Sequence, residues 1–235
     1  MRSSKAFTKR YFRELPIGVL LLVLLFAGAI ALFTLIVHEV FWEQEAEADH
    51  YIFDLLSNHV VRPELTGFME TVTYFASSLF LQIAYGILSL FYLIYRHWKR
   101  ALEIAAIGLG GFLVNYVMKL SFQRVRPPDP LIDPLHNFSF PSGHATSAFI
   151  FYGLLAYLVW KTHLSKVSKH IIGALLILFS LLIGFSRIYL RLHYPSDVLA
   201  GFCIGFAWLA FTIYLFERLK KKADKEATQQ AHPQS

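Results

Sequence analysis

The sequence predicts an all-α integral membrane protein, a single bundle of six transmembrane helices with both chain ends on the cytoplasmic side. Three observations predict this fold. Of the 235 residues, 56% are hydrophobic and only 16% are charged, a balance that soluble domains do not show. Six apolar runs approach the roughly 20 residues that a helix needs to cross ~30 Å of hydrocarbon. Lysine and arginine are concentrated between alternate runs.

The six runs cover residues 17–37, 72–95, 101–118, 145–160, 171–190 and 198–216. Two of them have recognisable starts: Ser142, just before the fourth, is a favoured N-cap residue, and Pro195, before the sixth, suits the first turn of a helix. Because no repeat or linker divides the chain, residues 1–219 are predicted to form one transmembrane domain. The polar segment 220–235 is predicted to be a disordered cytoplasmic tail.

The basic residues indicate the topology. The net charge of +6 could suggest a nucleic-acid partner, but 16 of the 22 lysines and arginines lie in four segments, residues 1–16, 96–100, 161–170 and 217–235. By the positive-inside rule these segments are cytoplasmic, and the loops after the first, third and fifth runs face outward. The protein is therefore expected in the cell membrane, either the plasma or the inner membrane, with no nucleic-acid partner.

The loop formed by residues 38–70 is the longest predicted outer connection, and it is acidic. Tyr51, Phe53 and Leu56 recur in it at near-helical spacing, which predicts either a short helix in the membrane interface or an ordinary loop packed on the helix ends. Gly201 and Gly205 form a GxxxG pair that allows close helix approach, either within the bundle or in a dimer.

A first cluster of cations lies where the third span ends. Lys119 emerges at the predicted outer surface, and Arg124 and Arg126 follow on the adjoining loop. Arg124 is interpreted as a lipid-headgroup contact. The chain direction after Arg126 is fixed by Pro127 and a second proline, which favours a defined role for that arginine.

A second cluster, Ser142-Gly143-His144, opens the fourth span. A serine N-cap and a glycine that lets the backbone approach a ligand closely are typical of an anion-binding helix start, where the helix dipole favours phosphate. A capped loop is the alternative for this motif taken alone.

The third cluster joins the fifth and sixth spans. His193 precedes the sixth span, and Asp197 falls in its first turn, close enough to orient one ring nitrogen and leave the other free to attack. Arg187 ends the fifth span, where a cation needs a partner such as a phosphate.

Together the clusters Lys119-x6-Arg126-Pro127, Pro141-Ser142-Gly143-His144 and Ser186-Arg187-x5-His193-x3-Asp197 resemble the complete signature of the type 2 phosphatidic acid phosphatase (PAP2) superfamily, in its membrane-bound lipid phosphatase branch. The resemblance covers residues 119–197. It implies a metal-independent phosphatase without a cofactor. The positive-inside rule places all three clusters, and hence the site, on the outer side of the membrane.

The resemblance also implies a role for each motif residue. His193 attacks phosphorus to form a phosphohistidine, Asp197 positions His193, and His144 protonates the leaving oxygen and later activates water. The implied phosphate-binding residues are Lys119, Arg126, Ser142, Gly143 and Arg187. His193 should start neutral and His144 charged, which predicts a bell-shaped pH profile of activity.

Phosphorylated membrane lipids are the expected substrates, because a site at the helix ends can receive a headgroup while the lipid tail stays in the bilayer. The family resemblance allows phosphatidic acid, phosphatidylglycerol phosphate, undecaprenyl pyrophosphate, lipid A phosphate or a sphingoid phosphate. The bilayer is the other expected partner, and no obligatory protein partner is evident from the sequence.

Three rival interpretations remain at this stage. A metal site could use His136, Asp133, His144, His193 and Asp197, although the nearby cations would repel a metal ion. A vanadate-dependent haloperoxidase would use a similar pocket, but the six spans argue against it. A non-catalytic transporter or binder of phosphorylated lipid would leave His144, His193 and Asp197 without a role.

Overall fold

Helices form most of the part of the chain that the structure describes. The computed structural model describes residues 17–44 and 47–231, and within these ranges every regular element is a helix. In chain order the elements are α2 (Ile17–Val37), η1 (His38–Glu43), α3 (Glu47–His59), α4 (Pro63–Tyr74), α5 (Ser78–Ile94), α6 (Trp98–Phe122), α7 (Gly143–Trp160), α8 (Lys166–Tyr189) and α9 (Pro195–Ala231).

The membrane spans agree with the sequence prediction, with one correction. Within the described part of the chain, five helices are long and apolar enough to cross a membrane, and the pair α4 and α5 makes a sixth span if it is counted as one. The sequence predicted an unbroken span over residues 72–95, whereas the helix axis bends there by 41°. The break arises because Ser77 adopts an extended conformation and caps α5 by accepting a hydrogen bond from the Phe80 amide at 3.3 Å.

Helix α7 is the centre of the bundle and packs most extensively against α8 and α9. Its inward face contributes Ala148, Phe151 and Tyr152 to a core shared with Ile183 of α8. Leucine and isoleucine side chains on the outward faces remain exposed, such as Ile87 of α5 at 65%. An apolar exterior of this kind is what hydrocarbon lipid requires.

Two glycines let α9 approach α7 at backbone distance. A Cβ atom at Gly201 would lie 2.8 Å from the carbonyl oxygen of Ser142, and one at Gly205 would lie 2.9 Å from that of Thr146. The GxxxG pair therefore serves packing within the bundle, the first of the two sequence interpretations. It also fixes where the start of α7 sits beside the start of α9.

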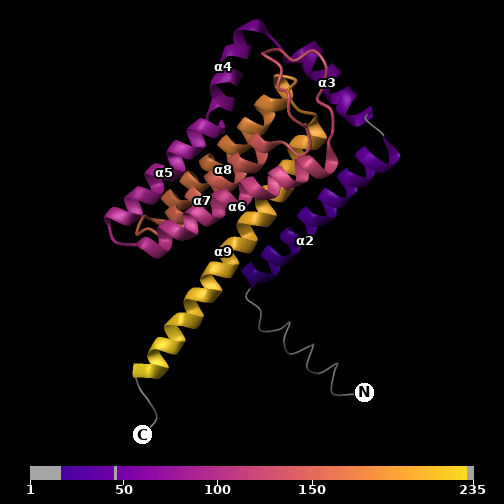
Figure 1. Ribbon diagram of the computed structural model, residues 1–235. Coiled ribbons are helices and arrows are strands. Elements are labelled where there is room, and N and C mark those ends of the chain that lie inside the picture. The colour runs from indigo at the N-terminus through magenta and orange to yellow at the C-terminus, as the bar shows by residue number, and fades with distance from the viewer. Residues whose placement is uncertain (1–16, 45–46, 232–235) are drawn as a thin grey trace, which may run out of the picture.

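Helix α9 continues farther than predicted. Residues 220–231 extend the helix through Ala231, whereas the sequence predicted a disordered tail from residue 220. This stretch is rich in lysine, alanine, glutamate and glutamine, which are good helix formers, and Lys222 pairs with Glu226 one turn later at 3.8 Å. In Figure 1 this part of α9 projects well past the other helices. Residues 232–235 of the predicted tail lie outside the described residues.

One end of the bundle is covered by irregular chain and a short helix. Figure 1 shows α3 and the loop of residues 123–142 gathered where α8 turns into α9. The short helix that the sequence offered as one alternative exists as α3, and its buried residues Asp49, Phe53 and Leu56 show that it packs on the bundle. We call this end of the bundle the site end, because the three sequence motifs meet there.

Candidate active site

The motif residues reach the site end from four helices and two loops. Lys119 lies in the last turn of α6, Ser142 caps the start of α7, Arg187 lies in the last turn of α8, and Asp197 lies in the first turn of α9. Because α6 and α8 end where α7 and α9 begin, residues far apart in sequence come together.

His193 and Asp197 form an oriented pair. The ring nitrogen Nδ1 of His193 lies 3.4 Å from Oδ2 of Asp197 and 3.2 Å from Oγ of Ser139. The Ser139 hydroxyl in turn donates a hydrogen bond to Asp197 Oδ2. His193 is 1% exposed and Asp197 and Ser139 are fully buried. This arrangement places the proton on Nδ1 and leaves Nε2 as the unprotonated ring nitrogen.

The surroundings of His193 favour the neutral ring. Burial first, and then the positive charges of Arg126, Arg187 and Lys119, hold the pKa of His193 well below its usual range. The imidazole is therefore neutral at pH 7, as the sequence predicted for the nucleophile.

Arg126 approaches the free nitrogen of His193. Its Nη1 lies 3.2 Å from His193 Nε2, while its Nε donates to the carbonyl of Asn137 at 2.7 Å. Burial lowers the pKa of Arg126 to about 10, so the guanidinium stays charged at neutral pH. A positive charge thus stands beside the atom that would attack phosphorus.

Arg187 is a buried cation with unused donors. The side chain is 2% exposed, and its Nη1 donates to Thr73 Oγ1 at 2.8 Å. Among the described residues its Nε and Nη2 have no hydrogen-bond partner. Since a buried charge is costly unless it is paired, two orphan donors at this position fit the oxygens of a phosphoryl group.

The start of α7 is capped by its own serine and is tied to α9. Ser142 accepts a hydrogen bond from the Ala145 amide at 3.4 Å, and its own amide donates to the Asp197 carbonyl at 2.9 Å. A Cβ atom at position 143 would lie 3.2 Å from Asn115 Oδ1, so the absence of a side chain at Gly143 lets Asn115 lie close to the start of α7. His144 follows as a half-buried residue in the first turn of α7.

Lys119 holds the loop that carries Ser139. Its Nζ donates to the carbonyl oxygens of Phe138 at 2.6 Å and Ser139 at 3.1 Å. A lysine ammonium has three donors, so one hydrogen remains for a ligand.

Arg124 has a different role from the predicted headgroup contact. Its guanidinium donates to Asp197 Oδ1 at 2.6 Å and to Asp49 Oδ2 at 2.8 Å, and it stacks on the ring of Tyr194 at 4.1 Å. Burial opposes its charge, but the carboxylates of Asp197 and Asp49 outweigh burial and raise the pKa of Arg124. Arg124 is thus an internal partner of Asp197.

Sequence reasoning missed two residues that complete this network. Asp49, from the acidic loop, accepts from the Ser196 amide at 2.8 Å and the Ser196 hydroxyl at 2.6 Å, which ties α3 to the start of α9. Ser139 bridges His193 and Asp197. Neither carries a spacing signal, although Ser139 lies within four residues of a motif.

The residues of the rival metal interpretation are not brought together. His136 and Asp133 are exposed on the loop, whereas His193 and Asp197 are buried. Within residues 17–44 and 47–231 no three histidine, cysteine, aspartate or glutamate side chains are grouped so as to hold a metal ion.

The comparison with known families decides the assignment. The model of the PAP2 superfamily matches residues 100–221, just over half of the chain and the part that contains all three motifs. This chain belongs to the PAP2 superfamily. The resemblance inferred from the motifs is confirmed.

Individual relatives support the same assignment. Phosphatidylglycerophosphatase B of Bacillus subtilis (strain 168) is 32% identical over 167 residues, which cover 70% of this chain and 81% of the relative. Undecaprenyl-diphosphatase BcrC of the same strain is 30% identical over 151 residues, covering 56% of this chain and 73% of the relative. Both relatives are phosphatases by name.

A solved structure shares the fold. The crystal structure of a transmembrane PAP2-type phosphatidylglycerolphosphate phosphatase from Bacillus subtilis superposes with a TM-score of 0.74 and 28% identity. The match covers 82% of this chain and 96% of that one. This PAP2 protein is therefore a multi-pass membrane protein with the all-helical PAP2 phosphatase fold.

Proposed function

We propose that this PAP2 protein is a lipid phosphatase that hydrolyses a phosphate monoester or diphosphate of a membrane lipid through a phosphohistidine on His193. The observation that carries the proposal is the buried His193–Asp197 pair beside Arg187, whose Nε and Nη2 have no partner among the described residues. An oriented histidine and a buried guanidinium with unused donors are what transfer of a phosphoryl group requires.

In the first step, Nε2 of His193 attacks phosphorus and the bond from phosphorus to the lipid oxygen breaks. The proton on Nδ1 stays directed at Asp197 and Ser139, so the positive charge that develops on the ring is stabilised. His144 gives its proton to the leaving oxygen. Lys119, Arg126 and Arg187, with Ser142 and the Gly143 amide, bind the phosphoryl oxygens, where charge has to be stabilised during transfer.

In the second step, water replaces the lipid. His144, now neutral, takes a proton from water, whose oxygen attacks phosphorus while the bond from phosphorus to Nε2 breaks. Inorganic phosphate leaves and both histidines return to their starting states. No step requires a metal ion or cofactor, so we propose that the reaction is metal-independent.

The substrate class follows from the position of the site and from the relatives. The motif residues lie at the ends of membrane-spanning helices, where a headgroup can enter while its tail stays in lipid. The named activities of the relatives make phosphatidylglycerophosphate and undecaprenyl diphosphate the first lipids to test, followed by phosphatidic acid. The basic segments at the other end favour an extracytoplasmic site in the cell membrane.

A transporter or binder of phosphorylated lipid is the second candidate, favoured by the orphan donors of Arg187 alone. It predicts that His193→Ala keeps function and Arg187→Ala removes it. A histidine enzyme predicts that both variants lose phosphate release.

The deciding experiment measures phosphate release by purified protein from a panel of lipid phosphates and diphosphates, with and without chelator. The wild type is compared with His193→Ala and with His136→Ala, a control that removes an exposed histidine from the neighbouring loop. We expect release that survives chelation, vanishes in His193→Ala and persists in His136→Ala. Release by His193→Ala at the wild-type rate would refute the mechanism.

A further inference from the structure

A second groove lies at the end of the bundle opposite the site end. It has a volume of about 720 Å³ and is bounded by the turn between α5 and α6, the end of α7 and the projecting part of α9. Lys99 and Lys119 are 20 residues apart on α6, so the groove and the candidate active site are separated by about 30 Å along that helix.

The groove is positively charged. Five basic side chains and two acidic ones line it. Two of the basic groups are already matched, Arg100 by Glu103 at 2.7 Å and Lys161 by Glu217 at 2.8 Å. The other three are exposed and form no ion pair within the described part of the chain; they are Arg96, Lys99 and Lys220.

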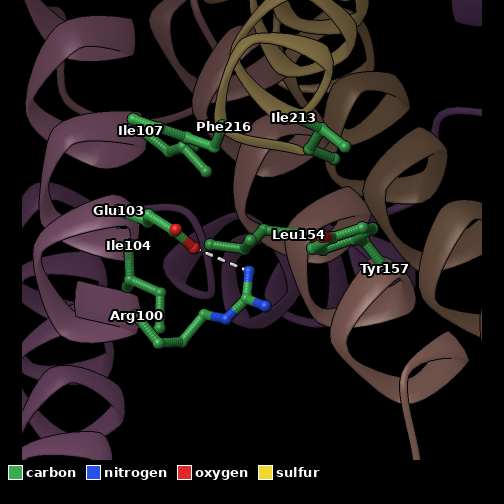
Figure 2. A pocket seen from close by; sticks show the side chains of 8 residues that line it. All are labelled: Arg100, Glu103, Ile104, Ile107, Leu154, Tyr157, Ile213 and Phe216. Atoms are coloured by element: carbon green, nitrogen blue, oxygen red, sulfur yellow. Dashed lines mark hydrogen bonds and ion pairs between the residues drawn. The ribbon is translucent and has the colours of Figure 1, made fainter. Parts of the chain in front are cut away.

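Part of the groove lining is apolar. Leu158 of α7 and Phe216 and Leu219 of α9 form this part, which we call the apolar floor. Figure 2 shows a smaller adjoining cavity between α6, α7 and α9, whose lining includes the Arg100–Glu103 ion pair, Tyr157 and Phe216. The groove therefore combines a charged rim with a hydrocarbon surface.

Aromatic side chains place the groove at the membrane surface. Trp98 and Tyr92 line it, and Lys99 lies 5.6 Å from the ring of Trp98. Tryptophan and tyrosine collect where hydrocarbon meets headgroups. We therefore expect the cations of the groove at headgroup depth.

We propose that this groove binds the anionic headgroup of a phospholipid. Basic pockets between transmembrane helices at this depth bind anionic headgroups, and the volume is within the roughly 300–1,000 Å³ of ligand sites. Arg96, Lys99 and Lys220 contact the phosphate, and Phe216 and Leu219 pack on the first part of the acyl chains. A free phosphate ion would use the cations but leave the apolar floor in water.

The projecting part of α9 makes the site possible. Lys220 lies in the stretch that continues the helix beyond the apolar span, and it forms a wall of the groove only because that stretch is helical. The bound lipid would hold this part of α9 against the α5–α6 turn. The proposal concerns the opposite end of the bundle and does not depend on the proposed catalytic function.

The test is a titration of delipidated protein in detergent, followed by native mass spectrometry, with phosphatidylglycerol or phosphatidylcholine. The variant Arg96→Gln/Lys99→Gln/Lys220→Gln is compared with Lys166→Gln/Lys169→Gln/Lys225→Gln, which removes three charges near the same end without touching the groove. Thermal unfolding monitored by circular dichroism shows whether each protein is folded, whether or not it is active.

We expect the wild type to bind phosphatidylglycerol at least about tenfold more tightly than phosphatidylcholine, because each basic group near a headgroup strengthens anionic lipid binding. The groove variant should lose this preference and the control should keep it. Equal binding of both lipids by the wild type, or an unchanged preference in the folded groove variant, would overturn the proposal. Complete displacement of the lipid by millimolar inorganic phosphate would overturn the lipid assignment in favour of a free-phosphate site.

Discussion

Replacing Asp49 by asparagine is expected to slow phosphate release about tenfold without weakening substrate binding. Asp49 is 4% exposed and lies on α3, outside the three motifs. One carboxylate oxygen accepts from Arg124 at 2.8 Å and from the Ser196 hydroxyl, and the other accepts from the Ser196 amide. Asparagine keeps one oxygen but puts an NH₂ donor where the other stood, facing groups that are donors themselves.

The size of the effect follows from what the substitution leaves in place. A hydrogen bond to a charged group contributes about 1.5–3 kcal/mol, and breaking a buried ion pair completely costs about 3–5 kcal/mol. Arg124 keeps its second carboxylate partner, Asp197, at 2.6 Å. We therefore expect the substitution to cost about 2 kcal/mol of interaction free energy, within the range for a single hydrogen bond to a charged group. If about 1.4 kcal/mol of this lost free energy is added to the activation barrier, the rate falls about tenfold.

The reason for a loss in rate is that Arg124 holds Asp197 from the side opposite His193. Without the Asp49 carboxylate, Asp197 is the remaining ion-pair partner of Arg124, beside the Ser196 hydroxyl at 2.7 Å and the Tyr194 ring, so the guanidinium fixes the carboxylate that orients His193 less firmly. Lys119, Arg126 and Arg187 are untouched, so KM should stay within about twofold of the wild type. Asp49 is in this sense a positioning residue.

The assay is steady-state phosphate release together with rapid-quench measurement of the phosphoenzyme. Asp54→Asn is the matched control, because it makes the same chemical change at an exposed position of the same helix. We expect slower phosphoenzyme formation and a lower kcat for Asp49→Asn, and wild-type values for Asp54→Asn. A destabilised Asp49→Asn protein with an unchanged kcat, or with a raised KM and normal kcat, would show that Asp49 only anchors α3 and would refute the reasoning.

Four further outcomes are expected. Gly201→Ala should destabilise the protein by about 1–3 kcal/mol and lower kcat, because its Cβ would lie 2.8 Å from the Ser142 carbonyl oxygen and push the start of α7 away. The control Gly86→Ala, whose Cβ would have no atom within 4 Å, should leave thermal unfolding unchanged. Since the pKa of His193 is held well below 6.5, its neutral form persists as the pH falls, and the loss of kcat/KM in acid should begin only well below pH 6.5. The profile is corrected for the ionisation of the substrate, which is measured separately. A loss centred at or above pH 6.5 would contradict this prediction. Ser139→Ala should lower kcat by about tenfold, because His193 Nδ1 then depends on a single partner at 3.4 Å; a variant as fast as the wild type would show that the serine has no part in orientation. Dialysis against chelator should leave phosphate release unchanged, and restoration of lost activity by added metal ions would contradict the metal-independent mechanism.

Much of the fold and site was predictable because the signals are local. Apolar runs long enough to span a bilayer identify the helices, and Ser142 and Pro195 mark two helix starts without reference to any distant residue. The three motifs predicted the candidate site residues, because the spacing within each motif is short. Their meeting at one end followed from the alternation of helices across a membrane.

Local sequence patterns did not predict two features of the fold, the bend between α4 and α5 and the helical extension of α9. The bend between α4 and α5 depends on a three-residue break that a hydropathy window averages away. The polar composition of residues 220–231 resembles a disordered tail, yet these residues continue a helix already nucleated in the bundle, so they need only propagate it. Forming the first turn is the step of helix formation that costs the most free energy, and the apolar span of α9 has already formed the helix that these residues extend.

The sequence by itself determined the membrane class, the spans and the motif residues, because hydropathy and short spacing are properties of adjacent positions. Only the tertiary structure decided that Arg124 pairs with Asp49, 75 residues away, and that Thr73 contacts Arg187. It also decided that α9 closes a groove with the α5–α6 turn. These partners are set by how closely helices pack, which depends on contacts such as those of Gly201 and Gly205 with α7, and no local pattern in the chain encodes them.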